Sequence, residues 1–158
     1  MSLDQSVIAE NNATRERLRA LVARLSDEAL ARPLGDGRTI ATILGHIAFW
    51  DRRVLVLLDH WTRGDAQPSP ADAEPEDVDW INDAVQGFLL AMSPRDLAQF
   101  ALRTAEEVDS QVARVSPELV AAIRAVGEPI ALARFYHRGE HLDEIEQLLN
   151  ESSSTTSH

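Results

Sequence analysis

The sequence contains no cysteine, which excludes disulfide bonds, thiolate zinc sites and a cysteine nucleophile. Any metal ion must therefore be bound by nitrogen and oxygen atoms. Positive charge is also scarce, because fifteen Lys and Arg residues stand against twenty-six Asp and Glu residues, for a formal net charge of −11. A surface this negative repels phosphate backbones and anionic lipids, so we expect neither nucleic acid nor a membrane as a partner.

Long hydrophobic runs are missing as well, since no stretch approaches the roughly 20 apolar residues that span a bilayer. Residues 1–12 lack the basic and apolar regions of a signal peptide, so we expect a cytoplasmic protein. Hydrophobic residues make up 44% and charged residues 26%, as in ordinary globular proteins. The 158 residues fit one domain, which we place at 1–150 and follow with a disordered polar tail at 151–158.

Apolar residues recur at helical spacing along most of the chain. This pattern predicts long helices at 3–25, 40–61 and 94–115 and a last helix that begins at Pro129. It also predicts a helical stretch at 78–92 and short helices at 27–31 and from Pro117 to near Gly127. Residues 62–77 carry three prolines and almost no apolar residue, which indicates an irregular connection. The sequence therefore predicts an all-α fold, a four-helix bundle with a long crossover between helices 2 and 3 and short helical insertions.

Three histidines form a candidate metal site. His137 and His141 are four residues apart, so they lie on one face of a helix and can bind one ion. His46 lies in the apolar stripe of 40–61 and is the candidate third ligand from another helix. Three neutral imidazoles leave a coordination position open, as in catalytic sites. The alternative is that these histidines are hydrogen-bonded core residues.

Competing metal motifs fit less well. Residues 137–141 read H-x-x-E-H, but that peptidase pattern needs a distant acidic ligand downstream, and only seventeen residues follow. A di-iron bundle needs Glu-x-x-His, whereas Arg134 and Arg138 stand three residues before the two histidines. His60 is fourteen residues beyond His46, about 21 Å along the same helix, and is too far away to share the ion.

Acidic residues near the histidines are weaker candidates. Glu140 and Glu144 could orient the imidazoles or act on a bound water as catalytic residues, although most glutamates on a helix surface are only solvated. Asp51 is followed by Arg52 and Arg53, which predicts ion pairs on the helix surface.

Three stretches of the sequence carry a resemblance to a known family. They are TIATILGHIAFWD at residues 39–51, DWIN at residues 79–82, and the spacing of His137, His141, Leu142 and Ile145. Together they resemble the DinB-like superfamily. This group of bundles also includes the bacillithiol transferases and the metal-binding domain of mycothiol-dependent maleylpyruvate isomerase.

The resemblance implies a four-helix bundle that holds a metal on His46, His137 and His141. It further implies zinc or nickel as the ion and, because several family members are dimers, a homodimer. Many relatives carry a tryptophan just before the position of Thr39, where this chain has Arg38.

The function expected from these features is that of a metal-dependent enzyme, in which the ion activates a bound water or thiol. A small-thiol S-transferase or a hydrolase acting on a small molecule fits this chemistry. A low-molecular-weight thiol cofactor would need basic residues at the mouth of the site, for which Arg134 and Arg138, with Arg52 and Arg53, are the candidates. The alternative is a non-catalytic metal-binding or stress-response bundle.

Overall fold

The computed structural model describes residues 2–71 and 74–155. In these ranges the regular secondary structure is helical, and no β-strand is present. The helices are α1 (Gln5–Arg24), α2 (Asp27–Ala31), α3 (Ile40–Arg63), α4 (Pro75–Ala91), α5 (Pro94–Ala113), α6 (Pro117–Ala125) and α7 (Phe135–Thr155). No helix among the described residues is long and apolar enough to cross a membrane. The predicted all-α fold is confirmed.

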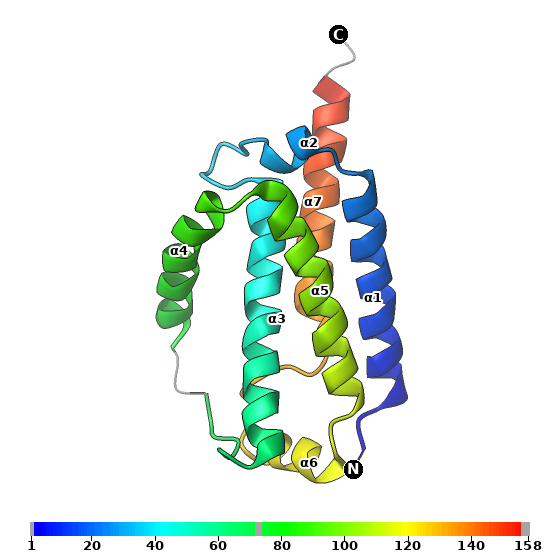
Figure 1. Ribbon diagram of the computed structural model, residues 1–158, viewed down its shortest axis with the longest axis vertical. Coiled ribbons are helices and arrows are strands. Elements are labelled where there is room, and N and C mark those ends of the chain that lie inside the picture. The colour runs from blue at the N-terminus through cyan, green and yellow to red at the C-terminus, as the bar shows by residue number, and fades with distance from the viewer. Residues whose placement is uncertain (1, 72–73, 156–158) are drawn as a thin grey trace.

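Four long helices, α1, α3, α5 and α7, lie side by side and form the bundle (Figure 1). The helices α3 and α5 run in the same direction, while α1 and α7 run in the opposite one (Figure 1). A parallel pair needs a long connection to bring the chain back. Here α4 forms the second part of that connection and packs along the outside of α3.

The helix starts follow from local capping. Thr39 accepts a hydrogen bond from the backbone N–H of Thr42, whose hydroxyl group accepts one from Thr39 in return. Ser93 and Ser116 cap α5 and α6, each followed by proline at the first helical position. At its other end α3 stops at Gly64, whose φ of 78° suits a residue without a Cβ atom.

Two apolar clusters form the core, one above the other along the bundle. One joins residues of α3 such as Ile43 and Ile47 to α1, α5 and α7, and the other joins Val54 and Leu58 to α5, α6 and the segment before α7. Between them on α3 lies Asp51, which is buried to 1% exposure. A polar layer therefore separates the two apolar clusters.

The start of the last helix differs from the prediction. The helix α7 begins at Phe135, and residues 129–134 form a non-helical segment, so the predicted start at Pro129 is wrong. Ile130 and Leu132 are buried in this segment without being helical. Asn11 of α1 takes the place of a local cap, because its side chain accepts a hydrogen bond from the N–H of Phe135 and donates one to the carbonyl of Leu132.

The polar tail also differs from the prediction. The helix α7 continues to Thr155, so residues 151–155 are helical where disorder was expected, and residues 156–158 lie outside the described part of the chain. Ser153, Ser154 and Thr155 each donate a side-chain hydrogen bond to the backbone carbonyl four residues earlier. These hydroxyl groups are satisfied inside the helix, and the polar composition is therefore compatible with it.

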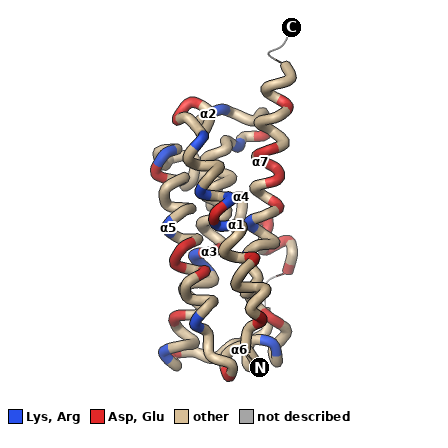
Figure 2. Tube along the Cα trace, turned by 90° about the vertical axis from the view of Figure 1, so that its right-hand side faces the viewer, with Lys and Arg blue, Asp and Glu red and all other residues tan. Residues whose placement is uncertain are grey.

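Ion pairs on the surface join α7 to the neighbouring α1. Acidic residues recur along the upper half of α7 (Figure 2). Arg17 of α1 lies 2.6 Å from Asp143 and 2.8 Å from Glu146. Pairs as exposed as these add only about 0–1 kcal/mol each, so the packing of α7 depends chiefly on its buried side.

Candidate metal centre

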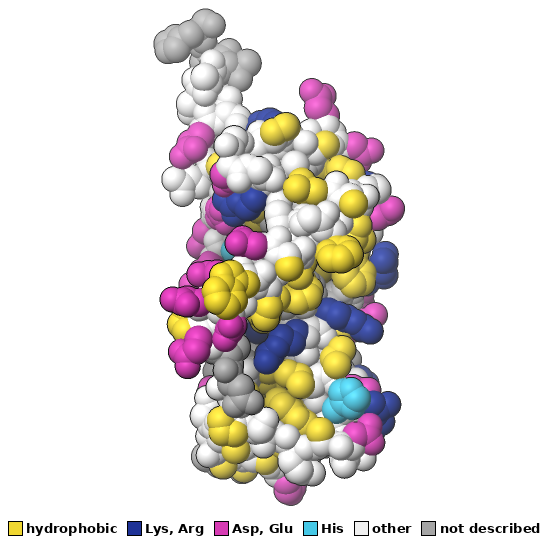
Figure 3. Space-filling view, turned by 90° about the vertical axis from the view of Figure 1, so that its left-hand side faces the viewer, with side chains coloured by type: hydrophobic (Ala, Val, Ile, Leu, Met, Phe, Trp, Pro, Cys, Tyr) yellow, Lys and Arg dark blue, Asp and Glu magenta, His cyan; other side chains and the backbone are white. Residues whose placement is uncertain are grey.

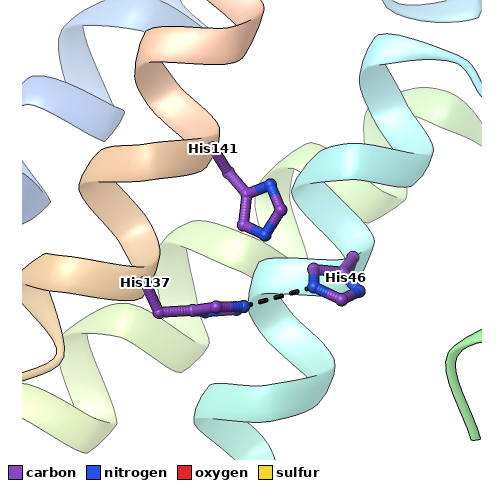
Figure 4. Close-up of side chains that lie close together, drawn as sticks. All are labelled: His46, His137 and His141. Atoms are coloured by element: carbon purple, nitrogen blue, oxygen red, sulfur yellow. Dashed lines mark hydrogen bonds between the residues drawn. The ribbon is translucent and has the colours of Figure 1, made fainter. Parts of the chain in front are cut away.

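The three histidines of the sequence pattern meet between α3 and α7. His46 points from the second turn of α3 toward His137 and His141, which lie one turn apart on α7 (Figure 4). One ring nitrogen from each histidine lies within 4.8 Å of the other two, and the Nε2 atoms of His46 and His137 are 3.2 Å apart. The fold thus brings together residues that are 91 positions apart in the chain.

Burial keeps two of these rings neutral. Together with the nearby ring of His141, it lowers the pKa of His46 to about 4 and that of His137 to about 3. A neutral imidazole has a lone pair on one nitrogen and is therefore in the form that binds a metal. At neutral pH these two side chains are ready to act as ligands.

The arrangement fits a divalent ion. Nitrogen atoms lie about 2.0–2.1 Å from zinc, so two nitrogens bound to the same tetrahedral ion are about 3.3 Å apart. The 3.2 Å between the Nε2 atoms of His46 and His137 matches this spacing. Nδ1 of His137 is buried with no hydrogen-bond partner among the described residues. The polar contacts of this ring are therefore all made within the histidine cluster.

Glu144 orients the third histidine. Its Oε2 atom lies 3.2 Å from Nδ1 of His141, and its Oε1 atom lies 2.6 Å from the guanidinium of Arg38. Burial alone would raise the pKa of Glu144, but the hydrogen bonds from Arg38 and His141 outweigh it and lower the pKa below its ordinary value. A carboxylate that accepts a hydrogen bond from Nδ1–H keeps the proton on Nδ1 and leaves the Nε2 lone pair free for a metal. Glu140, by contrast, is exposed and contacts no polar partner in the described ranges.

A buried charge cluster lies beside the histidines and consists of Arg15, Arg134, Arg138, Asp51 and Asp109. Arg138 is fully buried and donates to both oxygens of Asp109, at 3.0 Å each, and to Asp51 at 3.2 Å. It therefore faces the interior of the bundle, away from any opening. The expectation that Arg138 binds a thiol at the mouth of the site does not agree with this position.

Asp51 also departs from the prediction, because its partners are Arg134 and Arg138 and not the adjacent surface arginines. The reason is helical spacing. Asp51 follows Ile47 by four residues and precedes Val54 by three, which places it on the buried face of α3. Arg52 points outward and lies 3.7 Å from Glu107 of α5.

A cavity of about 560 Å³ opens beside the histidines, which is large enough for a small organic molecule. Its walls come from α3, α4, α7 and the segment before α7, and the lining includes Arg53 and Arg134. Trp50 lies edge-on to His46, with ring centroids 6.4 Å apart, and its Nε1 donates to the side chain of Asn82 at 2.9 Å. This hydrogen bond fixes α4 to α3 at the level of the histidines.

A second cavity of about 290 Å³ reaches the same histidines from the side of Arg38. It shares His46, Asn82 and His141 with the larger cavity and is lined in addition by polar residues that include Asp36, Arg38 and Gln86. A bound ion would thus lie between an apolar cavity and a polar one.

Sequence reasoning assigned no role at the site to Arg38 or Asn82. The sequence had drawn attention to both for other reasons, to Arg38 as a departure from the family pattern and to Asn82 as the last residue of the DWIN segment. Their positions in the sequence gave no sign of their partners, because Glu144 lies 106 residues from Arg38 and Trp50 lies 32 residues from Asn82.

The sequence and structure were compared with known proteins to identify the family of this chain. Searches of curated proteins and of solved structures found no match to this chain. The family model described as the DinB superfamily matches residues 10–149, which include all three histidines and run from within α1 to within α7. The chain belongs to the DinB superfamily.

Proposed function

We propose that this protein is a cytoplasmic metal-dependent enzyme that binds one divalent ion, zinc or nickel, through His46, His137 and His141. It acts on a small molecule as a small-thiol S-transferase or as a hydrolase. The observation that carries the proposal is the cluster of three imidazole nitrogens within 4.8 Å at the wall of a cavity of about 560 Å³. Family membership supports it, because the match covers the three histidines.

The bound ion would lower the pKa of a water or thiol and so supply a nucleophile at neutral pH. The residues of this chain prepare the site for that step. Burial keeps His46 and His137 unprotonated, and Glu144 holds His141 in one orientation. The apolar walls limit the access of bulk water, which strengthens electrostatic interactions inside the cavity.

An open coordination position separates this proposal from a non-catalytic metal-binding bundle. Structural zinc sites are closed by four protein ligands, whereas catalytic sites have three and an exchangeable position. No cysteine is present to supply a fourth ligand, and among the described residues the only carboxylate in contact with His46, His137 or His141 is that of Glu144. Both of its oxygens are already in contact, one with His141 and one with Arg38.

Cobalt substitution tests the open position. We expect cobalt-loaded protein to change its visible absorption spectrum when azide or 2-mercaptoethanol is added, because either ligand can enter the free position. The His46→Ala variant serves as the control and should show neither the cobalt spectrum nor the response. A cobalt spectrum that neither ligand alters would favour the non-catalytic alternative.

The homodimer stays a prediction. The outward face of α4 exposes large apolar side chains, among them Trp80 at 64% and Phe88 at 77% exposure, and apolar side chains gather over this helix in Figure 3. Sedimentation analysis of the full chain measures the oligomeric state directly.

A further inference from the structure

The larger cavity beside the histidines combines an apolar wall with positive charge. We propose that it binds an amphipathic anion, a molecule with an apolar body and a carboxylate-like headgroup, and that Arg53 and Arg134 bind the headgroup. That the bound anion is the substrate rests on the function proposed above. Binding itself does not require it.

The apolar wall comes from three parts of the chain. Trp50 and Val54 belong to α3, Val78 and Ile81 belong to α4, and Ile130 belongs to the segment before α7. Ile81 remains 39% exposed in the free protein. A ligand with an apolar body would remove this surface from water, which is favourable by about 25 cal/mol per Å².

The charge of the lining is positive although the chain as a whole is strongly negative. Arg53 and Arg134 line the cavity, and none of the described residues that line it is acidic. Arg53 lies over the ring of Trp50, 5.9 Å from its centroid, and has no carboxylate partner within the described ranges. Dark-blue basic side chains stand among the yellow apolar ones on this face of the molecule (Figure 3). The cavity therefore favours an anion over a cation.

Two hydrogen bonds within the protein hold the guanidinium of Arg134 in place. Its Nε donates to Asp51 at 2.8 Å and its Nη1 donates to the carbonyl of Ala131 at 3.2 Å, while Nη2 has no hydrogen-bond partner in the part of the chain that is described. Asp51 divides its charge between Arg134 and Arg138. Arg134 is only 5% exposed, so its guanidinium is fixed and largely desolvated, and an anion that reaches Nη2 gains a charge-assisted hydrogen bond.

The distance between His46 and Arg53 along α3 gives the approximate length of the ligand. Arg53 follows His46 by seven residues, which is about 10 Å along a helix at 1.5 Å per residue. A molecule whose headgroup contacts Arg53 and whose other end reaches the histidines is therefore about 10 Å long. 4-Phenylbutyrate has an apolar ring, a short chain and a carboxylate, and it meets this requirement.

Calorimetric titration of the full chain tests the proposal with 4-phenylbutyrate and its neutral counterpart 4-phenylbutanamide. We expect the carboxylate to bind about tenfold more tightly, the gain typical of one hydrogen bond to a charged group. Arg53→Gln should remove most of this preference. Arg52→Gln is the matched control and should keep it, because Arg52 does not line the cavity. Arg53 is exposed, so its replacement should not disturb folding.

The same titrations in metal-free His46→Ala protein separate this proposal from the metal-dependent function. A preference for the carboxylate that persists without metal supports the anion site even if the enzyme proposal fails. Equal binding of the two probes, or no detectable binding of the carboxylate, would overturn the anion site. So would a carboxylate preference that disappears in His46→Ala and survives in Arg53→Gln, because the carboxylate would then bind the ion itself.

Discussion

Replacing Arg138 with methionine tests whether the buried charge cluster fixes α7 against the rest of the bundle. Arg138 lies between the two histidines of α7 in the sequence and is fully buried. Its guanidinium donates to Asp51 and Asp109 and also to the carbonyl of Asn11 and the hydroxyl of Thr14. It therefore joins α7 to α1, α3 and α5 at the level of the candidate metal site.

The contacts of Arg138 set the expected loss in the free energy of unfolding. Removing one partner of a buried ion pair costs about 3–5 kcal/mol, because the other charge is left in a medium of low dielectric constant. Here each carboxylate keeps a second partner, since Asp51 is 2.8 Å from Arg134 and Asp109 is 3.1 Å from Arg15. The loss should therefore fall at the lower end, about 3 kcal/mol in the free energy of unfolding. For a chain of this size it corresponds to a fall in Tm of roughly 6–12 °C.

Urea denaturation followed by circular dichroism measures this loss. Methionine is unbranched and uncharged and matches the aliphatic stem of arginine, so the variant removes the ion pairs and keeps the packing of the stem. Arg52→Met is the control, because Arg52 is exposed and its pair with Glu107 at 3.7 Å should contribute less than about 1 kcal/mol. If Arg138→Met costs no more than this control, the buried charge cluster does not stabilise the fold.

Three further predictions concern the histidines and the packing around them. Because the pKa of His46 is lowered to about 4 while the unfolded chain binds this proton near pH ~6.5, metal-free protein should lose stability as the pH falls below ~6.5. Urea titrations between pH ~7 and ~5 measure this slope, and His46→Ala should make it shallower while leaving the part that His137 contributes. Glu144→Ala should weaken zinc binding about 10–100-fold in a chelator competition, whereas Glu140→Ala should leave it unchanged. Gly45→Val should cost about 1–3 kcal/mol in urea denaturation, because a Cβ atom there would lie 2.8 Å and 3.0 Å from leucine side chains of α4 and α5. A Cβ atom at Gly139 would meet no such atom within 4 Å, so Gly139→Val is the control and should not show this packing cost.

Much of the fold follows from local sequence signals. The start of α3 at Ile40, of α5 at Pro94 and of α6 at Pro117 agree with the prediction, because serine or threonine caps and prolines act within one turn. The start of α7 could not be found in this way. Its cap is Asn11, 124 residues away from Phe135, and the apolar residues before it pack into the core without forming a helix.

The candidate site shows the same division. The spacing of His137 and His141 and the position of His46 in an apolar stripe predicted that the three rings would meet, and they lie together in the structure. The hydrogen bond between Glu144 and His141 lies within one helical turn, but the contact of Glu144 with Arg38 depends on how two segments pack. The helical spacing of Asp51 placed it on the buried face of α3, but its charge favoured a position on the surface. The acidic partner of a buried arginine is visible only once the helices are assembled.

The central claim is that His46, His137 and His141 together hold one divalent ion. Elemental analysis of purified protein without an affinity tag tests it most directly, beside the His46→Ala, His137→Ala and His141→Ala variants. We expect one zinc or nickel ion per chain in the wild-type protein and its loss from each variant, with all four proteins remaining helical by circular dichroism. Wild-type protein that binds no metal even when zinc or nickel is added, or variants that retain the ion, would contradict the account.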